Sequence, residues 1–288
     1  MARLVGSRRA VSGCLLLIVL AGVARVGAAD RPEDVPATRS SAAALSPASA
    51  PAPVAPQPPP VAVPAPAGLP TIDYQGIPGG FPADHAPASV GPVTEGLHPE
   101  RKLAVYDSAG GRPRAFLPRS ISGLPVVVPI VARRTGWVAV LMPSANRRIG
   151  WLPTSGWVPR ALRDQLVVSR RQHQLTWLRD GRPLQRWTVA VGAAQTPTPL
   201  GRTFVLGRTG THGDVYAGLD ALVLAAVPED RAALAAGLRG AHTGIHGWSH
   251  QSAFGRSVSN GCIRMPATAQ RTLLDNVVPG TTVHVVDG

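Results

Sequence analysis

Short hydrophobic runs separated by Gly, Pro, Ser and Asn occupy the chain from residue 95 onwards. Runs of about four to eight residues between turn-forming residues are typical of β-strands. Within residues 95–160 the predicted strands cover 103–106, 125–131, 136–141 and 149–153. Their spacing predicts a small antiparallel β-barrel.

Residues 164–287 continue this pattern and add two helices. The predicted strands cover 165–168, 174–178, 185–192, 203–206 and 282–286, the first two forming a hairpin. One helix is predicted from Pro228 to Gly240, because acidic residues follow the proline and Ala and Leu follow them. A second is predicted from Pro266 to Val277. The fold class expected for the whole chain is therefore mainly β, with short helices.

Residues 30–94 have a different composition, in which Pro, Ala and Ser dominate. Proline-rich segments lack backbone donors and favour extended, polyproline-like conformations. We therefore predict a disordered linker that acts as a spacer for the β-rich part of the chain.

Residues 1–29 have the pattern of a secretory signal peptide. Basic residues come first, an apolar stretch covers 11–23, and small residues precede Asp30. The apolar stretch is shorter than the roughly 20 residues that a membrane-spanning helix needs. We expect export, a secreted, periplasmic or cell-wall-associated protein, and no stable membrane span after signal cleavage.

Signal cleavage would change both the charge and the cysteine count. The whole chain has a formal charge of +13, and without its first 29 residues it keeps 25 basic and 16 acidic residues, or +9. This charge suits an anionic cell wall. No nucleic-acid partner is expected for an exported protein whose basic runs do not exceed a dipeptide. Cys14 would be removed, which leaves Cys262 without an internal disulfide partner.

Cys262 lies in a segment of small residues, 257–266, and His246 lies upstream between Gly244 and Gly247. A thiol becomes a good nucleophile when an imidazole or a helix N-terminus assists its deprotonation. Gly261 allows a substrate to approach the backbone closely. The alternative is a small buried apolar residue, which is the commoner role of a lone cysteine.

A metal site would require His242, His246 and His250 to act with Cys262. The glycines at 244 and 247 argue against one helix that presents all three histidines, and no acidic residue follows the first. We therefore expect neither a metal nor another cofactor.

Two motifs resemble the L,D-transpeptidases of the YkuD (ErfK/YbiS/YcfS/YnhG) family. The first comprises Ile245-His246-Gly247, Gly255 and the run from Ser259 to Met265, and the second is the segment Thr196–Phe204. The resemblance covers about residues 164–287 and implies a YkuD-like catalytic β-domain. It also implies peptidoglycan stem peptides as substrates.

In this family Cys262 corresponds to the nucleophile, which attacks the peptide bond after the third residue of a stem tetrapeptide. D-Ala is released, and the acyl-enzyme passes to an amine of another stem, which gives a 3→3 cross-link. His246 corresponds to the base, and the carbonyl of Gly247 to the group that orients it.

Other positions of the motif have implied roles too. The amides of Gly261 and Cys262, with Asn260, would hold the oxyanion, and Ser259 matches the small hydroxyl residue of the motif. Arg264 matches a position near the substrate, where it could hold a carboxylate. The family usually has His where this chain has Asn260.

Tyr216 lies in the segment 207–240, which we expect to cover the substrate cleft. It is a candidate substrate-facing aromatic residue, and packing in the interior is the alternative.

The Gly-Trp-Val and Gly-Trp-Leu-Pro sequences within residues 95–160 resemble bacterial SH3-like wall domains. The alternative is a β-module that only packs on its neighbour. The predicted order is a signal peptide at 1–29, a linker at 30–94, an SH3-like module at 95–160 and a catalytic domain at 164–287. We expect a monomeric L,D-transpeptidase, with an L,D-carboxypeptidase or a non-catalytic wall-binding protein as alternatives.

Overall fold

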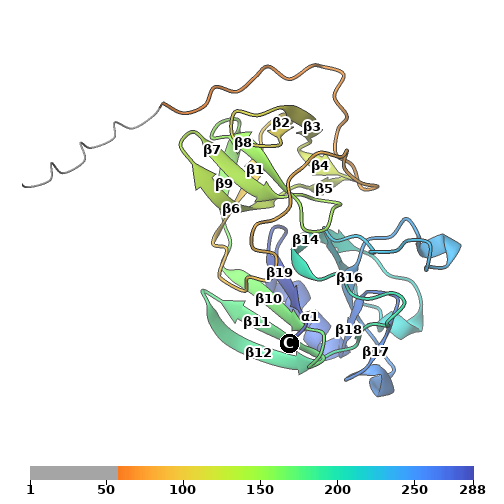
Figure 1. Ribbon diagram of the computed structural model, residues 1–288. Helices are drawn as coiled ribbons and strands as arrows, with labels where there is room; N and C mark the ends of the chain where they lie inside the picture. The colour runs from red at the N-terminus through yellow and green to blue at the C-terminus, as the bar shows by residue number, and fades with distance from the viewer. Residues whose placement is uncertain (1–57) are drawn as a thin grey trace, which may run out of the picture. The chain divides into compact units, whose positions relative to one another are not determined.

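The computed structural model describes residues 58–288, which belong to one compact unit (Figure 1). The predicted signal peptide and the first half of the predicted linker lie outside these residues. The described part of the chain forms two large β-sheets and one α-helix, so the mainly β prediction is confirmed.

The N-terminal sheet has the strand order β3-β2-β8-β7-β6-β1-β9, and its pairs are antiparallel. Its strands are β1 (Glu95–Pro99), β2 (Leu103–Tyr106), β3 (Pro113–Leu117), β6 (Val128–Arg134), β7 (Trp137–Leu141), β8 (Ile149–Pro153) and β9 (Trp157–Ala161). A small hairpin of β4 (Ser120–Ile121) and β5 (Leu124–Pro125) accompanies it. Trp137, Val138, Ala139, Val140 and Leu141 are all buried, so β7 forms the middle of this module.

The C-terminal sheet has the order β12-β11-β10-β19-β14-β15-β16-β18. Its strands are β10 (Asp164–Ser169), β11 (Gln174–Arg179), β12 (Arg182–Thr188), β14 (Gly201–Thr209), β15 (Ala221–Leu224), β16 (Gly244–Gly247), β18 (Ile263–Met265) and β19 (Thr282–Val286). A separate pair joins β13 (Val191–Gly192) to β17 (Ser257–Ser259). The pairs β10–β19 and β16–β18 are parallel, which requires long connections between the strands.

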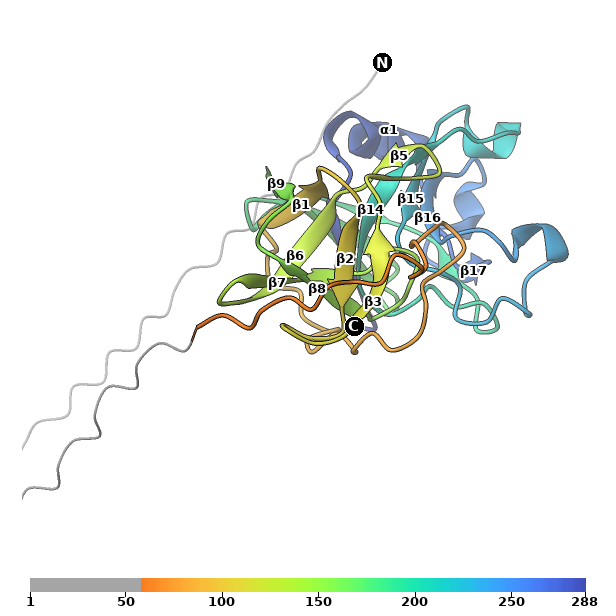
Figure 2. The same ribbon diagram turned by 90° about the horizontal axis from the view of Figure 1, so that it is seen from above.

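The single α-helix, α1 (Ala267–Asn276), follows Pro266 as the sequence predicts. Proline is favourable at a helix start because its missing N–H would have no partner there. The helix packs Ala269, Leu273 and Leu274 into the core of the C-terminal sheet. The helix contacts β16, and Figure 1 shows it beside this sheet (seen from above in Figure 2).

The strand β14 links the two cores. Val205 lies in the apolar core of the C-terminal sheet, whereas Phe204 and Leu206 lie in that of the N-terminal sheet. This follows from the alternation of side chains along a strand. A strand of the C-terminal sheet therefore completes the core of the module that precedes it.

The helix predicted from Pro228 to Gly240 is wrong. The structure has only the 3₁₀ turn Ala236–Leu238 there, and Leu234 is the buried apolar residue of the stretch. A helix of this length needs an apolar stripe to bury. Instead, polar contacts hold the segment: Asn146 bonds both backbone groups of Val227, and Arg147 pairs with Glu229.

Residues 58–94 also depart from the predicted linker, because they pack against both sheets. Ile72 and Phe81 are 1% and 4% exposed. The Trp137 indole donates to the carbonyl of Pro60 at 2.8 Å, and the Tyr106 hydroxyl donates to that of Val63 at 2.7 Å. A proline-rich chain still has free carbonyls, and the module supplies donors and an apolar surface that composition alone does not reveal.

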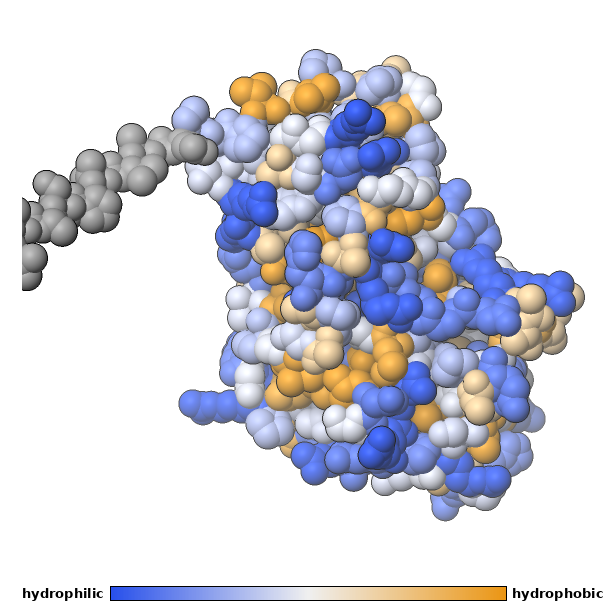
Figure 3. Space-filling view, viewed as in Figure 1, coloured by the Kyte–Doolittle hydropathy of each residue, from blue (hydrophilic) through white to orange (hydrophobic). Residues whose placement is uncertain are grey.

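The face shown in Figure 3 is mixed, with hydrophobic residues in separate groups among hydrophilic ones. Among residues 58–288, no helix has the length and apolar character needed to cross a membrane.

Candidate active site

The two motif strands β16 and β18 lie side by side and parallel, with His246 opposite Arg264. Ile245 and Ile263 are buried in the core of the sheet. Because side chains alternate along a strand, His246 and Arg264 project from the other face. Cys262 directly precedes β18, and alternation along the chain would place its side chain on the same face as those of Arg264 and His246.

His246 is 7% exposed, and its Nδ1 lies 2.9 Å from the carbonyl oxygen of Gly247. A carbonyl only accepts, so Nδ1 carries the proton and Nε2 of the neutral ring is left as an acceptor. Burial lowers the pKa of His246, and the nearby charge of Arg264 lowers it too, against the effect of the Gly247 hydrogen bond. The imidazole is therefore neutral at neutral pH and able to take a proton.

Cys262 is half-buried and is the one cysteine in residues 58–288. Burial raises the pKa of its thiol, and the backbone of Gly244 and the charge of Arg264 oppose this only in part. The resting site therefore holds a neutral thiol next to a neutral imidazole. A base is needed to generate the nucleophile during a reaction.

The loop before Cys262 is held by hydroxyl groups. The Ser259 hydroxyl donates to the Cys262 carbonyl at 2.5 Å and accepts from the Gly261 amide at 3.1 Å. The Thr198 hydroxyl donates to the Gly261 carbonyl at 2.8 Å and accepts from the Gly192 amide at 2.9 Å. Gly261 has φ +106°, a conformation that other residues rarely adopt. These bonds fix the position of the cysteine backbone.

Aromatic rings surround His246 and Arg264. The ring of Tyr216 meets that of His246 edge-on at 5.0 Å, and Trp248 lies 5.6 Å from His246. The Arg264 guanidinium lies 3.7 Å above the Trp248 ring centre, and its buried Nε has no hydrogen-bond partner within the described residues. Stacking on an aromatic face holds a guanidinium in place while its other donors remain available.

The segment that contains this site matches a known protein family. The YkuD family model, described as the L,D-transpeptidase catalytic domain, matches residues 163–285. Residues 163–285 are therefore similar to the L,D-transpeptidase catalytic domain of the YkuD family. The match covers less than half of the chain and leaves the N-terminal sheet outside.

Proteins similar to residues 163–285 come from several bacteria. YkuD of Bacillus subtilis (strain 168), whose name describes it as an L,D-transpeptidase, is 28% identical over 127 residues. These residues cover 44% of this chain and 68% of that protein. An L,D-transpeptidase structure from Mycobacterium smegmatis is 15% identical, with a TM-score of 0.36 over 56% of this chain and 90% of that one. One from Enterococcus faecium is 19% identical, with a TM-score of 0.32 over 43% and 49%.

Three other residues considered in the sequence analysis, Asn260, His250 and His242, differ in their exposure. Asn260 is exposed at the loop tip, and His250 is exposed beyond the strand that carries His246. Both ring nitrogens of His242 lie 2.7 Å from backbone carbonyls, those of Leu224 and Tyr74. Such contacts leave His242 no nitrogen for a metal ion.

The segment 207–240 covers the site only with its first part. The 3₁₀ turn Asp214–Tyr216 contacts β16, and the Ser249 amide donates to the carbonyl of Val215 at 2.9 Å. Its second part lies against the N-terminal segment, where the Arg231 guanidinium donates to the carbonyl of Gln75. The cleft cover that we predicted is therefore restricted to the region around Tyr216.

Sequence reasoning assigned no site role to Thr196, Thr198 and Trp248. The two threonines lie in the Thr-Pro-Thr-Pro segment of the second motif, and the Thr196 hydroxyl donates to the carbonyl of Ser259 at 3.1 Å. Trp248 follows His246 by two positions, which was the available signal for its place on the same face.

We expect iodoacetamide to alkylate Cys262 slowly at neutral pH and faster as the pH rises. The thiolate is the reactive form, and burial moves its formation to a pH above the ordinary cysteine value of about 8.5. Mass spectrometry of the Cys262 peptide, from about pH 6 to pH 10, would give the midpoint. A reactive plateau below pH 7 that His246→Gln removes would instead indicate a thiolate–imidazolium pair and contradict the neutral resting site.

Proposed function

We propose that this chain is an exported peptidoglycan L,D-transpeptidase that forms 3→3 cross-links through an acyl-enzyme on Cys262. The observation that carries the proposal is the parallel pairing of β16, which contains His246, with β18, which begins directly after Cys262. It is supported by the bond from His246 to the Gly247 carbonyl, which leaves Nε2 as the acceptor. The family of residues 163–285 supplies the reaction class.

In the proposed reaction, His246 Nε2 takes the thiol proton while the sulfur attacks the carbonyl carbon of the third stem residue. The carbon–nitrogen bond to the terminal D-Ala then breaks, and His246 returns the proton to the leaving amine. The amine of a second stem attacks the thioester, loses its proton to His246, and takes the acyl group. Cys262 is regenerated as a thiol.

Charge that develops on the attacked carbonyl oxygen needs hydrogen-bond donors. The Gly261 amide already donates to the Ser259 hydroxyl, so we assign the principal donor role to the Cys262 amide. Asn260 is exposed beside it and has a side-chain donor for the same oxygen or for the substrate. In this assignment Ser259 stabilises the loop and does not contact the reacting atoms.

Arg264 is proposed to hold a carboxylate of the stem peptide. Its guanidinium is fixed by the Trp248 ring, and Arg264 lies opposite His246 in the pair β16–β18. Tyr216 would cover the reacting groups from the opposite side, where its ring contacts His246.

The export and wall location rest on the sequence. We propose that residues 1–29 direct export, that the part of the predicted linker before residue 58 spaces the protein from its surroundings, and that 95–160 form an SH3-like module. A formal charge of +9 after cleavage suits a monomer that works within the anionic wall.

The product spectrum of the purified chain with a disaccharide-tetrapeptide tests the proposal. We expect release of D-Ala together with a dimer joined between two third residues. A shortened tripeptide without dimer would identify an L,D-carboxypeptidase. Unchanged substrate in the presence of protein that binds it would identify a non-catalytic wall-binding protein.

A further inference from the structure

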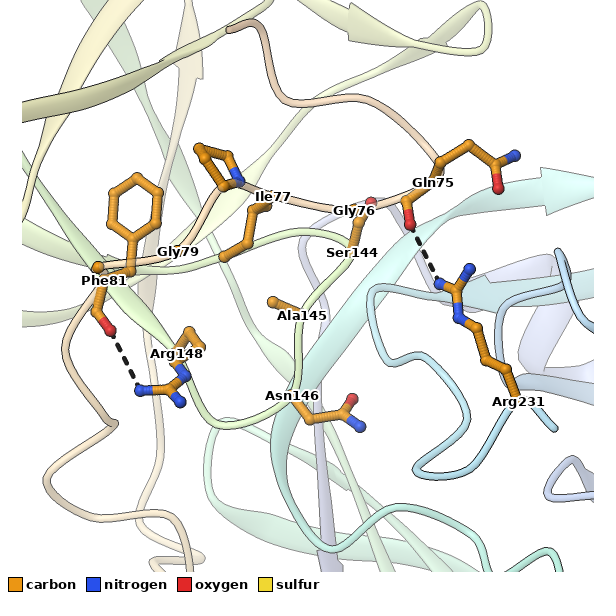
Figure 4. Close-up of a pocket in the computed structure, with 12 residues that line it drawn as sticks. Gln75, Gly76, Ile77, Gly79, Phe81, Ser144, Ala145, Asn146, Arg148 and Arg231 are labelled. Atoms are coloured by element: carbon orange, nitrogen blue, oxygen red, sulfur yellow. Dashed lines mark hydrogen bonds between the residues drawn. The ribbon is translucent and has the colours of Figure 1, made fainter. Parts of the chain in front are cut away.

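A cavity of about 610 Å³ lies away from Cys262, between three separate parts of the fold. One wall is the segment 75–81, which the sequence assigned to the linker. A second is the β7–β8 loop at 144–148, and Arg231 of the β15–β16 connection closes the third side (Figure 4). Neither of the two motifs includes any of these residues.

The cavity is cationic, and none of the described residues that line it is acidic. Its charged residues are Arg148 and Arg231, and neither forms a salt bridge within the described part of the chain. The adjacent Arg147, by contrast, is neutralised by Glu229. Two guanidinium groups without a carboxylate in one cavity favour an anionic ligand.

Each of these guanidinium groups keeps free donors. Arg148 donates to the carbonyl of Phe81 at 3.1 Å, and Arg231 donates to that of Gln75 at 3.1 Å. A guanidinium has five N–H donors, so one bond to a carbonyl orients it and leaves the others for a ligand. Figure 4 shows the two at opposite ends of the cavity, with Ile77 and Ala145 between them.

The walls of the cavity are held by long-range bonds. The Ser144 hydroxyl donates to the carbonyl of Asp73 at 2.7 Å, and Asn146 bonds the amide and the carbonyl of Val227. At Gly76 and Gly79 a Cβ would meet no atom within 4 Å, so open space lies beside them. The cavity is therefore preformed, and a large side chain at Gly79 would fill it.

We propose that this cavity is a second site for an acidic stem peptide, one that is bound but does not react. Two carboxylates separated by a short apolar part would match the guanidinium groups at its ends and the side chains of Ile77 and Ala145 between them. The choice of a stem peptide rests on the proposed function. In a polymer that has many stems, a second contact raises the effective concentration of the reacting one.

Titration calorimetry with a soluble disaccharide-tetrapeptide tests the second site. The full chain carries Cys262→Ala so that the probe is not consumed. We expect two binding sites per chain, and one after Arg148→Glu and Arg231→Glu are combined with Cys262→Ala. Gly79→Phe should also leave one site, because it fills the cavity and leaves both charges unchanged. Arg119→Glu is the matched control: this exposed arginine forms no salt bridge with any of residues 58–288, and its variant should keep two sites.

A single site in the Cys262→Ala chain that persists in both cavity variants, or two sites remaining in both, would overturn the proposal. In the chain that retains Cys262, the combined Arg148→Glu and Arg231→Glu substitutions should raise KM for the wall polymer about tenfold or more. They should leave KM for the soluble tetrapeptide unchanged. An equal change for both substrates would contradict a second site. Two calorimetric sites without any D-Ala release would refute the proposed function and retain the second site.

Discussion

Cys262→Ala is expected to abolish the release of D-Ala from a stem tetrapeptide while the protein stays folded. The proposed thioester cannot form without the sulfur, and no other cysteine occurs in residues 58–288. Loss of a catalytic nucleophile costs at least about 10³-fold in rate. Turnover is measured as D-Ala released per chain, and folding as the thermal unfolding midpoint.

The matched control for this variant is Val258→Ala, an exposed change on β17 just before the Cys262 loop. It should keep turnover within about twofold of the unmodified chain, since substitutions of exposed side chains usually have small effects. Equal turnover of the unmodified chain and Cys262→Ala would refute the assignment of the nucleophile. Loss of turnover in both variants would indicate that the loop conformation matters more than the thiol.

Phe204→Ala is expected to lower the free energy of unfolding by about 3–5 kcal/mol, the usual cost of removing a fully buried phenylalanine. Phe204 has no exposed surface, and it packs in the core of the N-terminal sheet although β14 belongs to the C-terminal one. A cavity there removes contacts from both sheets. Urea unfolding, followed by circular dichroism and by tryptophan fluorescence, measures the loss.

Leu184→Ala is the control, because Leu184 is 48% exposed on β12. Its free energy of unfolding should stay within about 0.5 kcal/mol of that of the unmodified chain. A change below about 1 kcal/mol for Phe204→Ala would show that β14 does not join the two cores. The same conclusion would follow if the urea unfolding of Phe204→Ala showed that only one of the two sheets is destabilised.

Much of the catalytic domain could be predicted because its signals are local. Alternating and continuous apolar runs, interrupted by turn residues, gave β10, β11, β14 and β19 near their observed bounds. Pro266 marked the start of α1. The motif could be recognised because His246 and Cys262 each lie in a short run that contains small residues.

Other elements depended on partners that are distant in the sequence. The stretch 228–240 has a helical composition, yet its polar contacts to the β7–β8 loop prevail over a weak local preference. Residues 58–94 have the composition of a linker, yet they lie against donors from both sheets: Tyr106 and Trp137 of the N-terminal sheet, and Gln165 and Arg202 of the C-terminal sheet. Local propensity contains no information on either set of partners.

The sequence by itself determined the mainly β class, the identity of the candidate nucleophile and base, and the expectation of export. Only the tertiary structure decided that β16 and β18 are parallel neighbours and that Thr198 supports the cysteine loop. It alone placed Trp248 beneath Arg264. The physical reason is that strand formation follows from local pattern, whereas pairing and packing join residues whose separation along the chain leaves no periodic trace.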